Sequence, residues 1–240
     1  MDSYSHAAKY YDHLYHFKDY SREVEFIAKI IRKCQGDGEI SLLDVACGTG
    51  VHIKHFRDHY FEAEGLDLSP QLLDTAGKRN PGVRFHKGDM TCFDLHRKYS
   101  VITCLFSAIG YVKTISGLES AAKCMADHLL PGGLLIVEPW FTPDAWRPGT
   151  VHTSIVDEPD LKIVRMNTSA VAGRVSVLDL HYLIGTPVET SHEFEKHELG
   201  LFTAVEMSSA FERAELAVDF DPEGITGRGL YICRKEPSGA

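Results

Sequence analysis

The stretch LLDVACGTGVHI, residues 42–53, joins an apolar run to a turn of small residues and then to a helix-like pattern. Glycines in such a turn let the backbone approach a ligand closely, and the start of the helix adds a partial positive charge. The small residues of the turn are Ala46, Gly48 and Gly50, and Asp44 precedes them. This pattern predicts a ligand-binding bend.

Two phosphate-binding motifs fit this turn poorly. A dinucleotide-binding turn carries a further glycine three positions on, where this chain has Ile53. The Gly-Lys-Ser/Thr ending of a triphosphate-binding loop is also missing. We therefore expect a ligand that joins a nucleoside to an amino-acid end, with a nicotinamide-dependent oxidoreductase as the distant alternative.

Three acids fit the parts of such a ligand. Asp67, followed by Leu68, ends an apolar run, and an acid there can accept hydrogen bonds from both ribose hydroxyls. Asp89 in the sequence GDM can accept the exocyclic amine of adenine, while Met90 lies against the ring. Asp44 can accept the ammonium group of the amino-acid end. Together these residues predict a cofactor site.

The elements that must position these residues alternate along the chain. Apolar runs predict strands at residues 40–45, 63–69, 83–90, 100–110 and 134–140, with helices between them. This alternation predicts an α/β fold with a doubly wound, mostly parallel sheet, covered by helices on both faces. Ligands of such sheets lie at the carboxyl ends of the strands.

The pattern changes in the second half of the chain. Residues 150–199 alternate polar and apolar positions between short turns, which predicts an antiparallel meander. We expect this insertion to form an acceptor pocket or a dimer contact. The expected domains are an N-terminal helical lid (1–36), a cofactor domain (37–145 and 192–240) and the antiparallel insertion (146–191).

Composition narrows the class of protein. The net charge of −9 argues against general binding to nucleic acid or to anionic membranes. No stretch has the roughly 20 apolar residues that span a bilayer, and the first residues show no secretory signal pattern. We therefore expect a cytoplasmic protein.

The spacing of the cysteines and histidines predicts no metal site. The six cysteines form no C-x-x-C motif, and Cys47, Cys104 and Cys233 are expected to be small core residues. His52, His55 and His59 fall close to one helical face, which we interpret as solvated.

Four segments in the right order carry a family resemblance: LLDVACGTG, EGLDLS, GDM and LLPGGLLIVE. With them the chain resembles the class I S-adenosylmethionine-dependent methyltransferases. Further segments are AAKYYDHLYHFKDY, FSAIGYVKT, VEPWFTPDAW, LDLHYL and GRGLYI. Through these it resembles the N,N-dimethyltransferases that act on amino groups of nucleotide-linked deoxysugars in natural-product biosynthesis, such as the desosamine enzyme.

The resemblance implies a seven-stranded sheet domain that holds S-adenosylmethionine, and an antiparallel layer that forms the acceptor pocket and a homodimer contact. It places Tyr11 and Tyr15 near the cofactor and Phe106 on its adenosyl side. The residues implied to face the acceptor are Tyr15, Tyr111, Trp140, His181 and Arg228.

The acceptor itself stays open. The segment HLYHFKDY carries less positive charge than the family pattern, which weakens the case for a diphosphate-bearing acceptor. A C- or O-methyltransferase of an aromatic, indole-like precursor is the alternative to methylation of an amino sugar.

Methyl transfer from a sulfonium is an in-line displacement, so the protein must hold acceptor, methyl and sulfur collinear. Aromatic walls can stabilise the sulfonium charge without reacting with it. An amine acceptor must be neutral before it attacks, and His181 is the first candidate base, followed by Tyr111 and Glu138. Alternatively, His181 is a meander histidine with a satisfied hydrogen bond, and Glu138 fixes a backbone amide.

Overall fold

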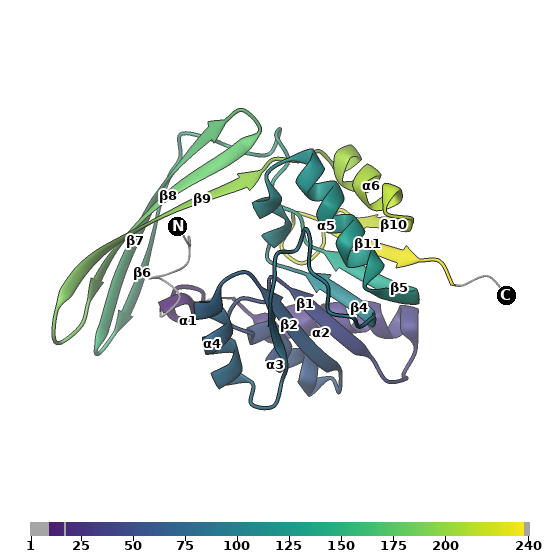
Figure 1. The fold of residues 1–240 in the computed structure, drawn as a ribbon. Helices are drawn as coiled ribbons and strands as arrows, with labels where there is room; N and C mark the ends of the chain where they lie inside the picture. The colour runs from purple at the N-terminus through teal and green to yellow at the C-terminus, as the bar shows by residue number, and fades with distance from the viewer. Residues whose placement is uncertain (1–9, 17, 238–240) are drawn as a thin grey trace.

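In this computed structural model, residues 10–16 and 18–237 are described. The larger sheet is built from β1 (Ser41–Val45), β2 (Glu62–Asp67), β3 (Phe85–Lys87), β4 (Tyr99–Cys104), β5 (Leu129–Val137), β10 (Leu216–Asp221) and β11 (Leu230–Lys235). Its order is β10-β11-β5-β4-β1-β2-β3 (Figure 1). Strands β1 to β5 pair in parallel, and β11 pairs antiparallel with β5 and β10. The predicted seven-stranded, mostly parallel sheet is confirmed.

The chain order of the strands reverses between β1 and β4, which lie side by side at the centre. This is the topological switch point, where doubly wound sheets open a crevice at the carboxyl ends of their strands. The apolar run of β1 is buried on both faces, since Leu42 and Leu43 are both fully covered. The predicted ligand-binding turn begins where β1 ends.

Helices cover both faces of this sheet. α2 (Tyr20–Gln35) and α3 (Val51–Asp58) pack on one face, around Ile27, Ile31 and Phe56. α5 (Ile115–Asp127) and α6 (Ala204–Arg213) pack on the other, around Met125 and Phe211. α4 (Pro70–Arg79) begins with Ser69 as its N-cap and Pro70 in its first turn, residue types that favour the start of a helix.

The second sheet is an antiparallel meander of β6 (Val151–Glu158), β7 (Leu161–Ala172), β8 (Val175–Gly185) and β9 (Thr190–Gly200). It stands beside the carboxyl edge of the larger sheet, with the short helix α1 (Tyr11–Leu14) against it (Figure 1). Its inner face packs Leu14 of α1 against Ile163 and Tyr182. The sheet ends at Gly200, beyond the expected domain boundary at residue 191.

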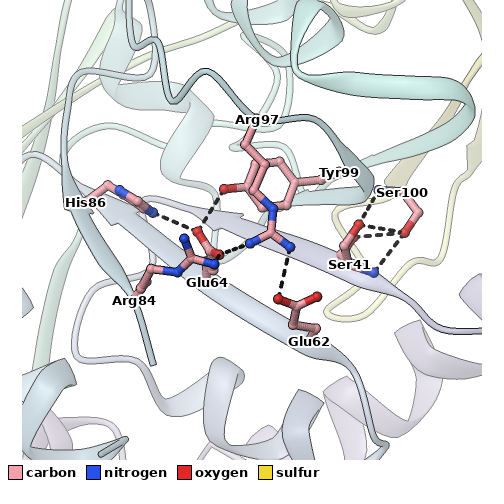
Figure 2. A network of polar contacts seen from close by, with 8 residues as sticks. All are labelled: Ser41, Glu62, Glu64, Arg84, His86, Arg97, Tyr99 and Ser100. Carbon is pink, nitrogen blue, oxygen red and sulfur yellow. Dashed lines mark hydrogen bonds and ion pairs between the residues drawn. The ribbon is translucent and has the colours of Figure 1, made fainter. Parts of the chain in front are cut away.

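A polar network ties together the opposite, amino-terminal edge of the larger sheet (Figure 2). Glu64 of β2 is 3% exposed, and it accepts hydrogen bonds from Tyr99 (2.9 Å) and His86 (2.8 Å) and pairs with Arg84 and Arg97. Burial acts to raise the pKa of Glu64, but these donors and charges outweigh it and hold that pKa below its usual value. The network fixes the sheet far from the ligand crevice.

Three of the six cysteines behave as predicted, because Cys47, Cys104 and Cys233 are buried free thiols in the apolar core. Among the helices that the structure describes, none has both the length and the apolar character needed to cross a bilayer.

Candidate functional site

A cavity of about 570 Å³ opens at the carboxyl ends of β1, β2 and β4 and is closed on its far side by the inner face of β8 and β9. The predicted site residues that line it are Tyr15, Asp44, Ala46, Gly48, Asp67, Leu68, Asp89, Met90, Phe106, Tyr111, Trp140 and Arg228. Cofactor and acceptor candidates therefore share one cavity, as the sequence predicts. Gly50, Glu138 and His181 are not part of the lining.

The glycine-rich turn takes a left-handed backbone at three positions. Ala46, Gly48 and Gly50 have φ angles of 58°, 55° and 71°. Gly50 is the N-cap of α3, and a Cβ there would lie 2.8 Å from the Asn80 side chain and 3.0 Å from Cβ of Ala76. Gly50 therefore allows α3 and α4 to pack closely, rather than lining the cavity as expected.

Asp67 connects the end of β2 to this turn. Its carboxylate is 8% exposed and accepts backbone N–H groups from Gly48 (2.9 Å) and Ser69 (2.8 Å). Each oxygen has a second lone pair that can accept from a ligand hydroxyl. Burial raises the pKa of Asp67, although the backbone donors oppose the shift. A ribose diol would replace the lost water and stabilise the charged form.

Asp44 lies deeper in the cavity and is 1% exposed. It accepts a hydrogen bond from the Thr103 hydroxyl at 2.7 Å. Burial raises its pKa to about 6, and neighbouring Asp67 adds to the shift while His52 opposes it. A cationic ligand group beside Asp44 would relieve this unfavourable burial, so the site suits the ammonium of an amino acid.

Asp89 lies at the rim of the cavity, just after β3, and is exposed. Its Oδ1 accepts from the backbone N–H of Thr91 (2.8 Å) and from the Thr91 hydroxyl (2.7 Å), which fixes the loop. Met90 follows it on the cavity wall. The pair is placed as the sequence predicts for contacts with an adenine edge and ring.

Aromatic rings surround the middle of the cavity. Tyr15 meets Phe106 edge to face at 5.2 Å, and the Lys18 ammonium lies 4.5 Å from the Phe106 ring and 4.8 Å from Tyr20. These ring faces already accept a cation, so the same wall can stabilise a sulfonium. The side chain of Tyr11, also predicted near the cofactor, lies outside the described part of the structure.

Glu138 holds this wall in place and does not face the cavity. It is fully buried and accepts the Phe106 N–H (2.7 Å), the Thr226 hydroxyl (2.7 Å) and the Arg228 guanidinium (2.8 Å). Phe106 and Ser107 have left-handed φ angles of 52° and 60°, which are strained for residues other than glycine. Hydrogen bonds such as these stabilise that backbone conformation. The structure supports the alternative role in which Glu138 fixes a backbone amide, and corrects its expected role as a base.

His181 points away from the cavity. Successive side chains of a strand alternate between faces, and Leu178, Leu180 and Tyr182 of β8 face inward. His181 therefore lies on the exposed outer face, where its ring stacks on His192 and its Nδ1 is 3.1 Å from the His192 Nε2. The expected roles of His181 as base and acceptor contact are wrong for this reason.

His197 occupies the inward position that sequence reasoning missed. It pairs with Leu178 across β8 and β9, lines the cavity, and lies with its Nδ1 2.6 Å from the Tyr111 hydroxyl. Its Nε2 is 3.2 Å from the carboxylate of Glu195. The alternation in EFEKHEL, with Glu195 and His197 two positions apart, was the available signal.

One of the three histidines predicted to be solvated differs from expectation. His52 is 7% exposed and its Nε2 lies 3.1 Å from the Glu23 carboxylate, whereas His55 and His59 are half-buried. Within the described residues, no three His, Cys, Asp or Glu side chains are grouped so that they could hold a metal ion.

A carboxyl-edge cavity with a left-handed glycine turn, one buried acid that suits an ammonium and a second that suits a ribose is typical of S-adenosylmethionine-dependent methyltransferases. Residues 42–133 match the family model described as a methyltransferase domain. An enzyme of Streptomyces fradiae, the dTDP-3-amino-3,6-dideoxy-alpha-D-glucopyranose N,N-dimethyltransferase, is 40% identical over 215 residues, which cover 89% of this chain and 84% of that enzyme. The chain belongs to the family of sugar N-methyltransferases that use S-adenosylmethionine.

Solved structures agree with this assignment. DesVI of Streptomyces venezuelae superposes with a TM-score of 0.89 at 36% identity, covering 96% of this chain and 98% of that one. CalS10, an amino pentose methyltransferase from Micromonospora echinaspora solved with bound S-adenosylmethionine, has a TM-score of 0.83 at 35% identity, covering 91% and 92%. The acidic, aromatic cavity described above fits this cofactor.

Proposed function

We propose that the enzyme transfers two methyl groups in succession from S-adenosylmethionine to the amino group of a nucleotide-linked 3-amino-deoxysugar. The observation that carries this proposal is the single cavity that joins a cofactor half to an aromatic, arginine-bearing half. Asp44, Asp67 and Asp89 belong to the first half, and Trp140 and Arg228 to the second. The relative from Streptomyces fradiae acts on a sugar of this class.

Two arginines offer the positive charge that the N-terminal segment lacks. Arg228 lies 5.9 Å from the Trp140 ring, and Arg165 of β7 lies 5.3 Å from the Tyr15 ring. In both side chains the Nε is buried and has no hydrogen-bond partner among the described residues. A buried donor without a partner is costly, and diphosphate oxygens would satisfy that of Arg228, which lines the cavity. This favours a nucleotide-linked acceptor over a neutral indole-like ring.

The direct test is incubation of the purified enzyme with S-adenosylmethionine and dTDP-3-amino-3,6-dideoxyglucose, followed by mass spectrometry. We expect products that carry first one and then two added methyl groups. The matched control is dTDP-glucose, which keeps the nucleotide and diphosphate but has a hydroxyl in place of the amine. Methylation of the control or of indole, with none of the amino sugar, would overturn the proposal.

We also propose that the N-terminal helix acts as a lid on the cofactor. Asp12 of α1 accepts a hydrogen bond from the Thr49 hydroxyl in the glycine-rich turn at 3.0 Å and pairs with Arg79 of α4. On its other side, His13 lies 2.9 Å from Glu158 of β6. These contacts place α1 between the cofactor half and the antiparallel sheet.

The outer face of the antiparallel sheet is the proposed homodimer contact. It carries large apolar side chains with high exposure: Ile155 (65%), Leu183 (52%), Phe194 (49%) and Met166 (47%). Exposed apolar patches of this kind mark interaction sites. Sedimentation analysis should give a dimer, and Leu183→Glu should shift it to a monomer. The cytoplasmic location stays a prediction.

A further inference from the structure

A line of polar groups runs from the cavity wall into the antiparallel sheet. The Tyr111 hydroxyl lies 2.6 Å from Nδ1 of His197, and Nε2 of His197 lies 3.2 Å from Oε2 of Glu195. The Tyr182 hydroxyl donates to the same carboxylate oxygen at 3.2 Å. Tyr111 and His197 line the cavity, whereas Glu195 and Tyr182 lie behind them and are almost fully buried.

The direction of these hydrogen bonds follows from the chemistry of the groups. An ionised carboxylate only accepts hydrogen bonds, so Nε2 of His197 carries the hydrogen that faces Glu195. In the neutral ring Nδ1 is then an acceptor, and it receives the hydroxyl hydrogen of Tyr111. The phenol oxygen is thereby prepared to take a proton from the cavity side as it gives its own proton to His197.

We propose that Tyr111, His197 and Glu195 form a proton relay that deprotonates the acceptor ammonium. The inference rests on the proposed function, since it assigns the base for an amino sugar. Tyr111 is the catalytic residue, because it lines the cavity that the acceptor enters. His197 and Glu195 are positioning residues that act through it.

Each round of the reaction balances without a further reactant. The ammonium gives one proton to the Tyr111 oxygen while the phenol proton moves to His197 Nδ1, and the resulting imidazolium is stabilised by Glu195. The freed lone pair of the nitrogen then forms the N–C bond with the methyl group, as the C–S bond breaks and sulfur keeps its electron pair. His197 returns its proton through Tyr111 to solvent when product leaves.

The need for a relay is greatest between the two transfers. After the first transfer the nitrogen is again positively charged, and it must lose a proton before it can attack a second methyl group. A positioned acid–base group contributes about 10²- to 10⁴-fold to such a step. Loss of the relay therefore slows both rounds.

The experiment compares Tyr111→Phe, His197→Gln and Glu195→Gln with the native enzyme across pH, using dTDP-3-amino-3,6-dideoxyglucose. We expect kcat/KM of the first two variants to fall about 100-fold near neutral pH and to recover as the pH approaches the pKa of the free amine. Affinity for S-adenosylmethionine, measured by calorimetry, should be unchanged. His192→Gln is the matched control, because it lies on the same strand but faces the opposite side of the sheet.

Loss of activity by the same factor at every pH would overturn the relay, and so would native activity in Tyr111→Phe. If the native enzyme itself leaves the amino sugar unmethylated, the proposed function fails instead. NMR of histidine-labelled protein tests the relay without any acceptor, with the His197 signal assigned by its absence in His197→Gln. We expect hydrogen on Nε2 in the native protein, and the Nδ1–H tautomer would contradict the relay.

Discussion

The carboxylate of Asp67 accepts the backbone N–H of Gly48 at 2.9 Å, which joins the end of β2 to the glycine-rich turn after β1. The neighbouring strands β1 and β2 are thereby joined at their carboxyl ends, beside the cavity. The acid shapes the backbone of the turn, and its remaining lone pairs are available to a ligand hydroxyl.

We expect Asp67→Asn to weaken binding of S-adenosylmethionine by about tenfold to 100-fold, since each lost hydrogen bond to a charged group is worth about 1.5–3 kcal/mol. An amide there cannot accept from Gly48 and from both ribose hydroxyls. Calorimetric titration measures the effect, with Asp74→Asn on the exposed face of α4 as a control that leaves affinity unchanged. Native affinity in Asp67→Asn would remove this acid from the cofactor site.

The pKa of about 6 for Asp44, raised by burial, predicts how cofactor binding depends on pH. Below that pKa the carboxyl group is protonated and cannot pair with the cofactor ammonium, so affinity should rise as the pH increases from about 5 to 7. Asp44→Asn should bind weakly at every pH. Calorimetric titrations at several pH values measure this, and a parallel rise in the variant would exclude Asp44 as the source.

The same group affects the stability of the free protein in the opposite direction. A folded-state pKa above the unfolded value means that the free energy of unfolding falls as pH rises through the interval from about 4 to 6. At neutral pH, burial of the charge costs about 3 kcal/mol, because the shift is about two pKa units. Asp44→Asn should therefore raise the melting temperature of the cofactor-free enzyme at neutral pH, and a lower melting temperature would contradict the cost.

Two glycines near α4 should respond oppositely to alanine. Gly50→Ala places a Cβ 2.8 Å from Asn80 at a φ of 71°, so we expect a loss of stability of about 1–3 kcal/mol. Gly77, within α4, has open space around it, and Gly77→Ala should stabilise by about 0.5–1 kcal/mol. Thermal denaturation measures both, and equal effects would show that the close packing of Gly50 does not matter.

Glu138 and Glu64 are buried acids at opposite edges of the sheet. Variants of the two distinguish a residue that supports acceptor binding from one that contributes to stability alone. Glu138→Gln should destabilise the fold by about 2–4 kcal/mol, because Arg228 loses its charged partner, and should also raise KM for the acceptor. Glu64→Gln, in the network of Figure 2, should destabilise without changing KM. If Glu138→Gln instead removes the acidic limb of the pH–rate profile, Glu138 acts as a base.

The cofactor half was predictable because its residues lie at strand ends, and parallel strands bring their carboxyl ends to one edge. Asp44 and Asp67 share the cavity for that reason. The acceptor half depends on which face of a meander turns inward, and a shift of one residue reverses every side chain. The apolar alternation of Leu178, Leu180 and Tyr182 is the sequence signal that places His181 on the outer face.

Other features depend on contacts between distant parts of the chain. From the sequence of α3 alone, His52 is expected at the surface. The packing of α2 against α3 is what places Glu23 next to it. The strand β10 was not predicted, because it is an edge strand with half of its side chains exposed and lacks a continuous apolar run. The roles of Gly50 and Glu138 likewise follow from tertiary partners that are far away in sequence.

The position of α1 has a consequence for the order of events during turnover. Its Asp12 bonds to Thr49 on the cofactor side, and its His13 meets Glu158 on the acceptor side. In the proposed double methylation, spent cofactor must be exchanged between the two transfers, and that exchange would disturb a helix which also contacts the antiparallel sheet. We expect a distributive enzyme, which releases singly methylated sugar into solution and binds it again for the second round.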